Sequence, residues 1–183
     1  FAHWMTDKDP LSWAAVHQTS TEQGAPASPI QDVRTWASYG TCVYIQTNPV
    51  HTGTEQLVYA LTQIHAHLEE ARKILPAYEQ APQHVQVTFE IGTSYFLEAA
   101  KIRAFKILWS NLLKMHGYTH CPPFIHGCSA VSSYTTEDTH SNLLRATTQL
   151  MSAAIGGVDS FEVVPFDAHL ADKNKHARRW ARN

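Results

Sequence analysis

The chain has 183 residues, of which 44% are hydrophobic and 16% charged, so it is long enough to bury a core and too apolar to be disordered. Its formal net charge is −2 with the histidines neutral, and no stripe of basic residues stands out, so we expect no nucleic-acid partner. No apolar run approaches the roughly 18 residues of a membrane span, and the first residues show no signal-peptide pattern, so we expect no membrane partner.

The cysteines favour a reducing compartment. Cys42, Cys121 and Cys128 make an odd number and form no CxxC pair, which is typical of free thiols and predicts a cytoplasmic protein. The sequence starts at Phe1 and stops at Asn183 inside a helical pattern, so we expect it to be a piece of a longer polypeptide.

Residues 1–29 are predicted to be an irregular N-terminal segment or linker, because Ser, Thr, Gln and Pro dominate residues 18–29. From residue 30 to residue 183 we predict one domain in which strands alternate with helices. A β-branched and aromatic run predicts a strand over Gly40–Gln46. The helix Glu55–Leu75 follows, with one apolar stripe made of Leu57, Leu61, Ile64 and Leu68.

The same rhythm continues to the last residues. The predicted elements are a strand Val85–Ile91, a helix Ser94–His116, a strand Phe124–Ser129, a helix over about 138–155 that Gly156-Gly157 closes, a strand Ser160–Phe166 and a last helix from near Ala168. The helix Ser94–His116 has an apolar side formed by Leu97, Ala100, Ala104, Ile107, Leu108 and Leu112. We expect Lys101, Arg103 and Lys106 to lie on an exposed face of that helix rather than to bind a phosphate group.

Strands and helices that alternate in this way predict an α/β fold with a parallel sheet. Periodicity alone does not separate a doubly wound sheet from half of a (β/α)₈ barrel. The Rossmann phosphate fingerprint G-x-G-x-x-G does not follow the first predicted strand, which leaves the dinucleotide-binding version without support.

Four blocks carry a family resemblance. They are Gln56-Leu-Val-Tyr-Ala-Leu61, the stretch from Ile91-Gly92 through Tyr95-Phe96, Glu98 and Lys101 to Trp109, the stretch Asn142-Leu-Leu-Arg145 with Gly156-Gly157, and Pro165-Phe166-Asp167 with the terminal Ala181-Arg182-Asn183. In this order and spacing they resemble the barrel domain of methylmalonyl-CoA mutases, which use cobalamin to interconvert methylmalonyl-CoA and succinyl-CoA. The resemblance implies a (β/α)₈ TIM-type barrel, of which this chain supplies four βα units, strands five to eight.

The resemblance also implies where an active site would lie, because barrel enzymes place their sites at the carboxyl ends of the strands. At those positions this sequence departs from the catalytic pattern. A His that faces the thioester is replaced by Ile45, and a Gln in the seventh strand by Cys128. Three positions near the corrin ring carry Asn48 in place of an acid, Val131 in place of a Gly and Ala168 in place of a Glu.

These departures resemble the small subunit of heterodimeric mutases, which binds no cobalamin. The resemblance then implies a chain without a working active site, which supports a homologous large catalytic subunit that binds adenosylcobalamin and acyl-CoA. The alternative is a divergent catalytic subunit of a methylmalonyl-CoA or related acyl-CoA mutase. The candidates for lining a substrate pocket are Tyr44, Ser94, His126 and Ser129, with Ser132 beside them.

A metal site is the other hypothesis that the residues raise. Ligand-type side chains occur at His120, Cys121, His126 and Cys128, but no second cluster stands at zinc-finger spacing, so we expect no metal site. His65 and His67 are predicted to be solvated on an exposed helix face. Cys128 has no paired His and acid at a known spacing, so a buried thiol is the favoured interpretation over a nucleophile.

Overall fold

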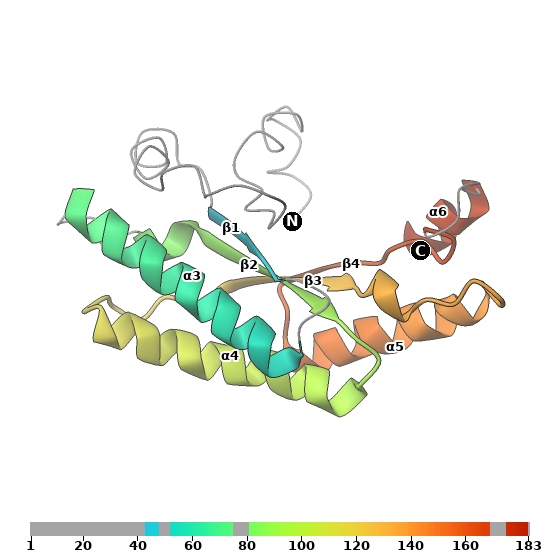
Figure 1. Cartoon of the computed structure of the whole chain (residues 1–183), viewed down its shortest axis with the longest axis horizontal. Helices are drawn as coiled ribbons and strands as arrows, with labels where there is room; N and C mark the ends of the chain where they lie inside the picture. The colour runs from blue at the N-terminus through green and yellow to red at the C-terminus, as the bar shows by residue number, and fades with distance from the viewer. Residues whose placement is uncertain (1–42, 48–51, 75–80, 169–174, 183) are drawn as a thin grey trace.

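A four-stranded sheet in which every strand pair is parallel forms the centre of the chain (Figure 1). The computed structural model describes residues 43–47, 52–74, 81–168 and 175–182, so the predicted irregular segment 1–29 lies outside the described residues. The strands follow one another in the sheet in chain order: β1 (Val43–Gln46), β2 (Val85–Ile91), β3 (Phe124–Ser129) and β4 (Ser160–Glu162).

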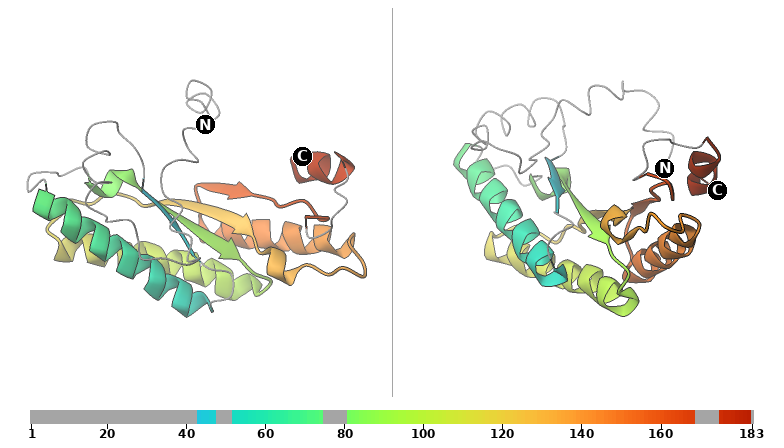
Figure 2. Two further views of the ribbon diagram at one scale, coloured as in Figure 1. Left: turned by 45° about the horizontal axis from the view of Figure 1, so that its top comes forward. Right: turned by 45° about the vertical axis from the view of Figure 1, so that its right-hand side comes forward.

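The helices that connect the strands lie on one side of the sheet. They are α3 (Gly53–Ile74), α4 (Tyr95–Met115) and α5 (Ser141–Gly156), with the short 3₁₀ helices η1 (Ala81–His84) and η2 (Val131–Ser133) before β2 and after β3, and α6 (Lys175–Arg182) at the end. Figure 2 shows α3, α4 and α5 against the same face of the sheet. A doubly wound sheet carries helices on both faces. The α/β fold with a parallel sheet is therefore confirmed, in a singly wound arrangement.

Most element boundaries agree with the predicted ones to within three residues. The exceptions lie near the end of the chain. β4 ends at Glu162 and not at Phe166, and Ala168 lies in a turn, while the last described helix begins at Lys175. The last helix is therefore present, although Ala168 itself is not helical.

The core lies between the sheet and the helices. Apolar and polar residues alternate along β2. Its apolar residues Val85, Val87, Phe89 and Ile91 are buried in the cluster that α3 and α4 cover. The predicted stripe of α3 is confirmed: Ile64 and Leu68 are fully buried, and Leu57 and Leu61 pack against the cluster at its edge. The other residues of β2, which are Gln86, Thr88 and Glu90, belong to the opposite face of the sheet.

Most of the apolar side predicted for α4 does not face the core, although Leu112 packs against the edge of the core cluster. Leu97 is 72% exposed and Ile107 is 64% exposed, whereas Ile102, Phe105 and Trp109 are fully buried. The helix carries two apolar stripes, and the stripe with the two aromatic rings is buried because those rings remove the larger apolar area from water. Phe105 packs edge-on against Phe89 of β2, with ring centroids 5.0 Å apart.

Close backbone approach joins α4 to α5. A Cβ atom on Gly156 would lie 2.9 Å from the Cβ of Ile102, so only glycine fits there. Gly157 has a φ of 84° and ends α5 in the left-handed conformation. Lys106 donates to the carbonyl of Gly157, and Arg103 donates to the carbonyl of Ile155 at 3.1 Å.

These two contacts add a structural role to the basic residues of α4. Cations are favoured at a helix C-terminus, where backbone carbonyls lack partners within the helix. Arg103 is exposed as predicted and Lys106 is half-buried, and both bind the end of α5.

We predict that Gly156→Val lowers the free energy of unfolding by about 1–3 kcal/mol, because the added side chain overpacks the contact with Ile102. Chemical denaturation of the full-length protein measures this change. Ala154→Val on the same helix is the control, since Ala154 is exposed and the substitution costs less than about 1 kcal/mol there. Equal effects of the two substitutions would contradict the close packing.

Candidate functional site

A cavity of about 710 Å³ lies at the carboxyl end of the sheet. Its walls come from the start of α3, the turn between β2 and α4, the first turns of α4 and the segment after β3. The polar residues that line it are Thr52, Thr54, Gln56, Glu90, Thr93, Ser94, Glu98, Lys101, Ser132 and Ser133. Ligands in parallel α/β folds bind at this end of the strands, so this cavity is the candidate site.

Local sequence signals position the two helices that border the cavity. A capping box begins α3: the backbone N–H of Thr52 donates to Oε2 of Glu55 at 2.7 Å, and the backbone N–H of Glu55 donates to the hydroxyl of Thr52 at 3.4 Å. Ser94 occupies the N-cap position of α4, yet its hydroxyl makes no capping hydrogen bond. That exposed hydroxyl is therefore available to a ligand in the cavity.

Lys101 is buried at the floor of the cavity, which corrects the prediction that it lies on an exposed face. Its side chain is only 3% exposed. The ammonium group donates to Oε1 of Gln56 and to the backbone carbonyl of Glu90, both at 2.8 Å, and pairs with the carboxylate of Glu98 at 2.5 Å. One cation thus connects α3, the end of β2 and α4.

Burial governs the electrostatics of this end of the sheet. It lowers the pKa of Lys101, although the carboxylate of Glu98 acts in the opposite direction. Burial also raises the pKa of Glu90 to about 7, although the nearby charge of Lys101 opposes that shift. Glu90 therefore changes its charge close to neutral pH.

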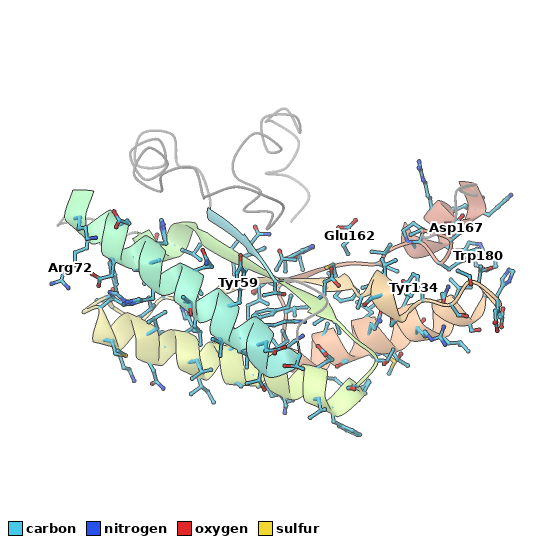
Figure 3. All side chains as sticks on the ribbon, in the orientation of Figure 1. Tyr59, Arg72, Tyr134, Glu162, Asp167 and Trp180 are labelled. Carbon is cyan, nitrogen blue, oxygen red and sulfur yellow. The ribbon has the colours of Figure 1, made fainter. Side chains whose placement is uncertain are left out.

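A polar row runs across the face of the sheet that α3, α4 and α5 leave uncovered. The ladder aligns Thr88 with His126 and Ser160, and Glu90 with Cys128 and Glu162. Nδ1 of His126 and the hydroxyl of Ser160 form a hydrogen bond of 2.8 Å, and burial lowers the pKa of His126. Figure 3 shows Glu162 pointing away from the helices. In a closed barrel this face would be the interior.

Cys128 lies between two carboxylates in that row. Burial raises the pKa of its thiol to about 12, and Glu90 and Glu162 add to the shift. Only the thiolate is a good nucleophile or metal ligand, and at neutral pH this group stays a thiol. The arrangement supports the buried-thiol interpretation of Cys128 over the nucleophile.

The structure brings together only part of the predicted substrate-binding set. Ser94 and Ser132 line the cavity, whereas Ser129 is 2% exposed and does not line it. His126 lies in the polar row. Tyr44 pairs with Gln86 in the ladder, and nothing is described of its side chain.

The positions predicted to lack the catalytic and corrin-contacting groups lie in or after the strands, toward their carboxyl ends. Ile45 pairs with Val87 in β1, and Val131 begins η2, next to the end of β3. Ala168 donates its backbone N–H to the carbonyl of Pro165 in a turn. Asn48 lies outside the described residues.

Sequence reasoning missed Gln56, Glu90 and Lys101 as residues of the site. A signal for Glu90 was present, because β2 alternates apolar and polar residues and Glu90 is the last polar one. No signal in the sequence placed the ammonium group of Lys101 beside Gln56, because the two residues are 45 positions apart and meet only through packing.

Several of the residues that carry the family resemblance make structural contacts. Asn142 is fully buried: its Nδ2 donates to the carbonyls of Thr135 and Phe166, and its Oδ1 accepts from the backbone of Thr135 and from Arg145. The indole of Trp109 donates to the carbonyl of Cys121 at 2.7 Å. These side chains hold loops at the two ends of the strands, so they specify the scaffold.

The sequence model of the family described as methylmalonyl-CoA mutase matches residues 31–183, which is most of the chain. The chain belongs to the methylmalonyl-CoA mutase family. This confirms the resemblance and agrees with its predicted extent from residue 30.

Among curated relatives, the small subunit of methylmalonyl-CoA mutase from Porphyromonas gingivalis is 37% identical over 134 residues, which cover 71% of this chain and 22% of that protein. The small subunit from Streptomyces virginiae is 32% identical over 106 residues, covering 57% of this chain and 17% of that protein. The large subunit from Porphyromonas gingivalis is 30% identical over 96 residues, covering 51% of this chain and 13% of that protein. The chain thus spans about a fifth of the length of the small subunits that it matches.

Among the helices of the described residues, none combines the length and the apolar character that crossing a bilayer requires.

Lys101→Met in this mutase-family chain is predicted to lower the free energy of unfolding by about 3–5 kcal/mol, because it leaves the carboxylate of Glu98 buried without its cation. Denaturant unfolding of the full-length protein measures the loss. Lys114→Met on the exposed surface of the same helix is the matched control, with an expected change within about 0.5 kcal/mol. The assigned role of Lys101 is wrong if the two variants unfold at the same denaturant concentration.

We predict that the raised pKa of Glu90 makes the stability of the folded protein depend on pH. Its pKa in the folded protein, about 7, lies above the ordinary 4.5, so the folded state holds this proton more tightly than the unfolded state. The contribution of Glu90 is therefore most favourable below pH 4.5 and is lost as the pH rises to about 7. Glu90→Gln should flatten the fall in melting temperature across that window, whereas Glu137→Gln, at an exposed position, should leave it unchanged. Parallel curves for wild type and Glu90→Gln would contradict the assignment.

Proposed function

We propose that this chain is part of the small, non-catalytic subunit of a cobalamin-dependent methylmalonyl-CoA mutase, the enzyme that isomerises methylmalonyl-CoA to succinyl-CoA. The observation that carries the proposal is the similarity to the small subunit of Porphyromonas gingivalis, which is higher and covers more of the chain than the similarity to the large subunit of the same organism. In this proposal residues 30–183 form strands five to eight of a (β/α)₈ barrel. The singly wound sheet supports that architecture.

The proposed role is structural support of a large catalytic subunit. Asn142, Gly156 and Trp109 make contacts that specify the scaffold, while the positions where catalytic members carry polar groups hold Ile45 and Cys128. The exposed apolar side of α4, which includes Leu97 and Ile107, supports association, because apolar side chains gathered on a surface are typical of interfaces. The free thiols of Cys121 and Cys128 support the cytoplasm as the compartment.

Adenosylcobalamin would supply the radical chemistry, and we propose that the partner subunit binds it. The residues of this chain do not fit the corrin ring: Val131 stands where the resemblance implies a glycine, and the nearby row carries the carboxylates Glu90 and Glu162 around a protonated thiol. We therefore assign no step of the rearrangement to residues of this chain.

The cavity at the carboxyl end of the sheet supports a retained acyl-CoA pocket. We propose that the hydroxyl of Ser94, which lines the cavity, contacts the ligand directly. We propose that Tyr44, His126 and Ser129 contribute to the wider pocket of the complete barrel, since the lining of this cavity does not include His126 or Ser129. Lys101 is not proposed as a carboxylate ligand, because Gln56, Glu90 and Glu98 already occupy its three donors.

A divergent catalytic subunit of a methylmalonyl-CoA or related acyl-CoA mutase is the second candidate. The large subunit from Propionibacterium freudenreichii favours it, since the match covers 81% of this chain, although at 23% identity. In that case the polar row with His126 and Glu90 would face the substrate.

A mutase assay separates the two candidates. The full-length protein is incubated with adenosylcobalamin and methylmalonyl-CoA, with and without its homologous large subunit. We expect turnover only when the large subunit is present, and no cobalamin bound to the full-length protein alone. Turnover by that protein alone would refute the structural role.

Substitutions in the assembled enzyme refine the result. If this chain is non-catalytic, Cys128→Ala should leave kcat within about a factor of two, because a protonated thiol is a poor nucleophile. A loss of about a hundredfold, the size expected for a general acid or base, would favour the catalytic alternative.

A further inference from the structure

Three ligand-type side chains converge at the opposite end of the fold from the cavity. Within the described residues, His65, Glu69 and His116 are the group of histidines, cysteines and acids whose ligand atoms all lie within 4.8 Å of one another. His65 and Glu69 are one helical turn apart on α3, and His116 caps the C-terminus of α4. In Figure 3, the label of Arg72 marks this end of α3, and Tyr134, in the segment after β3, lies on the opposite side of the picture.

The geometry of the two imidazoles suits a shared ion. Nδ1 of His65 and Nε2 of His116 are 2.9 Å apart, so the ring nitrogens point at one another and share one proton in the absence of an ion. Two nitrogens on a tetrahedral Zn²⁺, each about 2.0–2.1 Å from the metal, are roughly 3.3 Å apart. A separation of a few tenths of an ångström between α3 and α4 would therefore admit the metal in place of the proton.

Glu69 completes the set with a negative charge. Its Oε1 lies 3.2 Å from Nδ1 of His116, and its side chain is 43% exposed, so it is free to turn toward an ion beside His65. The side chain of His116 is only 4% exposed, which fixes one ligand in the structure, while His65 is exposed and gives access from solvent. Two histidines and one carboxylate form a donor set that zinc sites use.

We propose that His65, Glu69 and His116 bind one divalent transition-metal ion, with Zn²⁺ as the preferred occupant, and that the ion clamps α3 to α4 at the amino ends of the strands. The sequence predicted no metal site, and it predicted solvated histidines at positions 65 and 67. His67 is instead buried, whereas His65 is exposed as predicted and also contacts His116. The two helices are held together at the other end by Lys101, so the ion would fix both ends of one helix pair.

Neighbouring charges affect how tightly this site would bind a metal ion. The guanidinium of Arg72 is close enough to act on His116, and a positive charge disfavours a cation there. The ring of Tyr118 lies beside that of His116, with centroids 6.4 Å apart. Arg72→Ala should therefore tighten metal binding.

The test is a calorimetric titration of the full-length protein with Zn²⁺ after treatment with a chelator. His65→Ala removes a ligand at an exposed position, and His120→Ala removes another exposed histidine outside the cluster as the control. We expect wild type and His120→Ala to bind one more equivalent of Zn²⁺ than His65→Ala. We expect Glu69→Gln to weaken binding about 10- to 100-fold. Zn²⁺ should raise the melting temperature of wild type more than that of His65→Ala.

Co²⁺ provides a second readout that does not depend on stability. Co²⁺ bound by the wild type should show the strong visible absorption that is typical of a tetrahedrally coordinated ion. This absorption should be absent from His65→Ala. If His65→Ala binds the same number of Zn²⁺ equivalents as wild type with the same affinity, the ion lies elsewhere and the proposal is overturned. If wild type binds no Zn²⁺ at all, it is overturned as well.

Discussion

The ammonium group of Lys101 is the interaction on which the arrangement of this fold depends. It lies where α3, the end of β2 and α4 meet, and each of those elements supplies one of its oxygen partners: Gln56, the carbonyl of Glu90 and Glu98. A buried cation is costly unless all of its donors are satisfied, and here they are. The same group fixes the floor of the cavity and lies close enough to Glu90 to influence that carboxyl.

Two kinds of contact position the helices relative to one another: close approach at a glycine, and hydrogen bonds from charged side chains. Gly156 allows α5 to approach Ile102 of α4. Lys106 and Arg103 donate hydrogen bonds to backbone carbonyls at the C-terminus of α5. Asn142 holds the loop before α5 and the carbonyl of Phe166 beyond β4. The residues that link the chain to the mutase family are therefore explained by the scaffold that they build.

The two ends of the sheet differ in chemistry. The carboxyl end has a cavity with hydroxyl groups, a lysine ion pair and a carboxyl that titrates near neutral pH, which suits a polar ligand. The amino end has His65 and Glu69 of α3 beside His116 at the C-terminus of α4, which suits an ion that stabilises rather than reacts. In the proposed structural role, this chain needs rigidity more than chemistry, which the satisfied Lys101 provides and the proposed ion would add.

The sequence by itself determined the elements and their class. The alternation in β2, the stripe of α3 and the Gly156-Gly157 stop depend on neighbours within a few residues, and local patterns report such neighbours directly. The family followed from the same local blocks. Which of the two apolar stripes of α4 faces the core was decided only by tertiary packing, because Phe105 and Trp109 find partners on β2 and the loop after α4.

The site was likewise decided in three dimensions. Lys101 reads as a solvated cation in its own helix, and it becomes a buried anchor only when Gln56 arrives from 45 residues away. His65 stays on the surface, but folding brings His116, 51 residues further on, to 2.9 Å from it. Charged and imidazole side chains take their roles from partners that are distant in the chain, and folding alone brings those partners together.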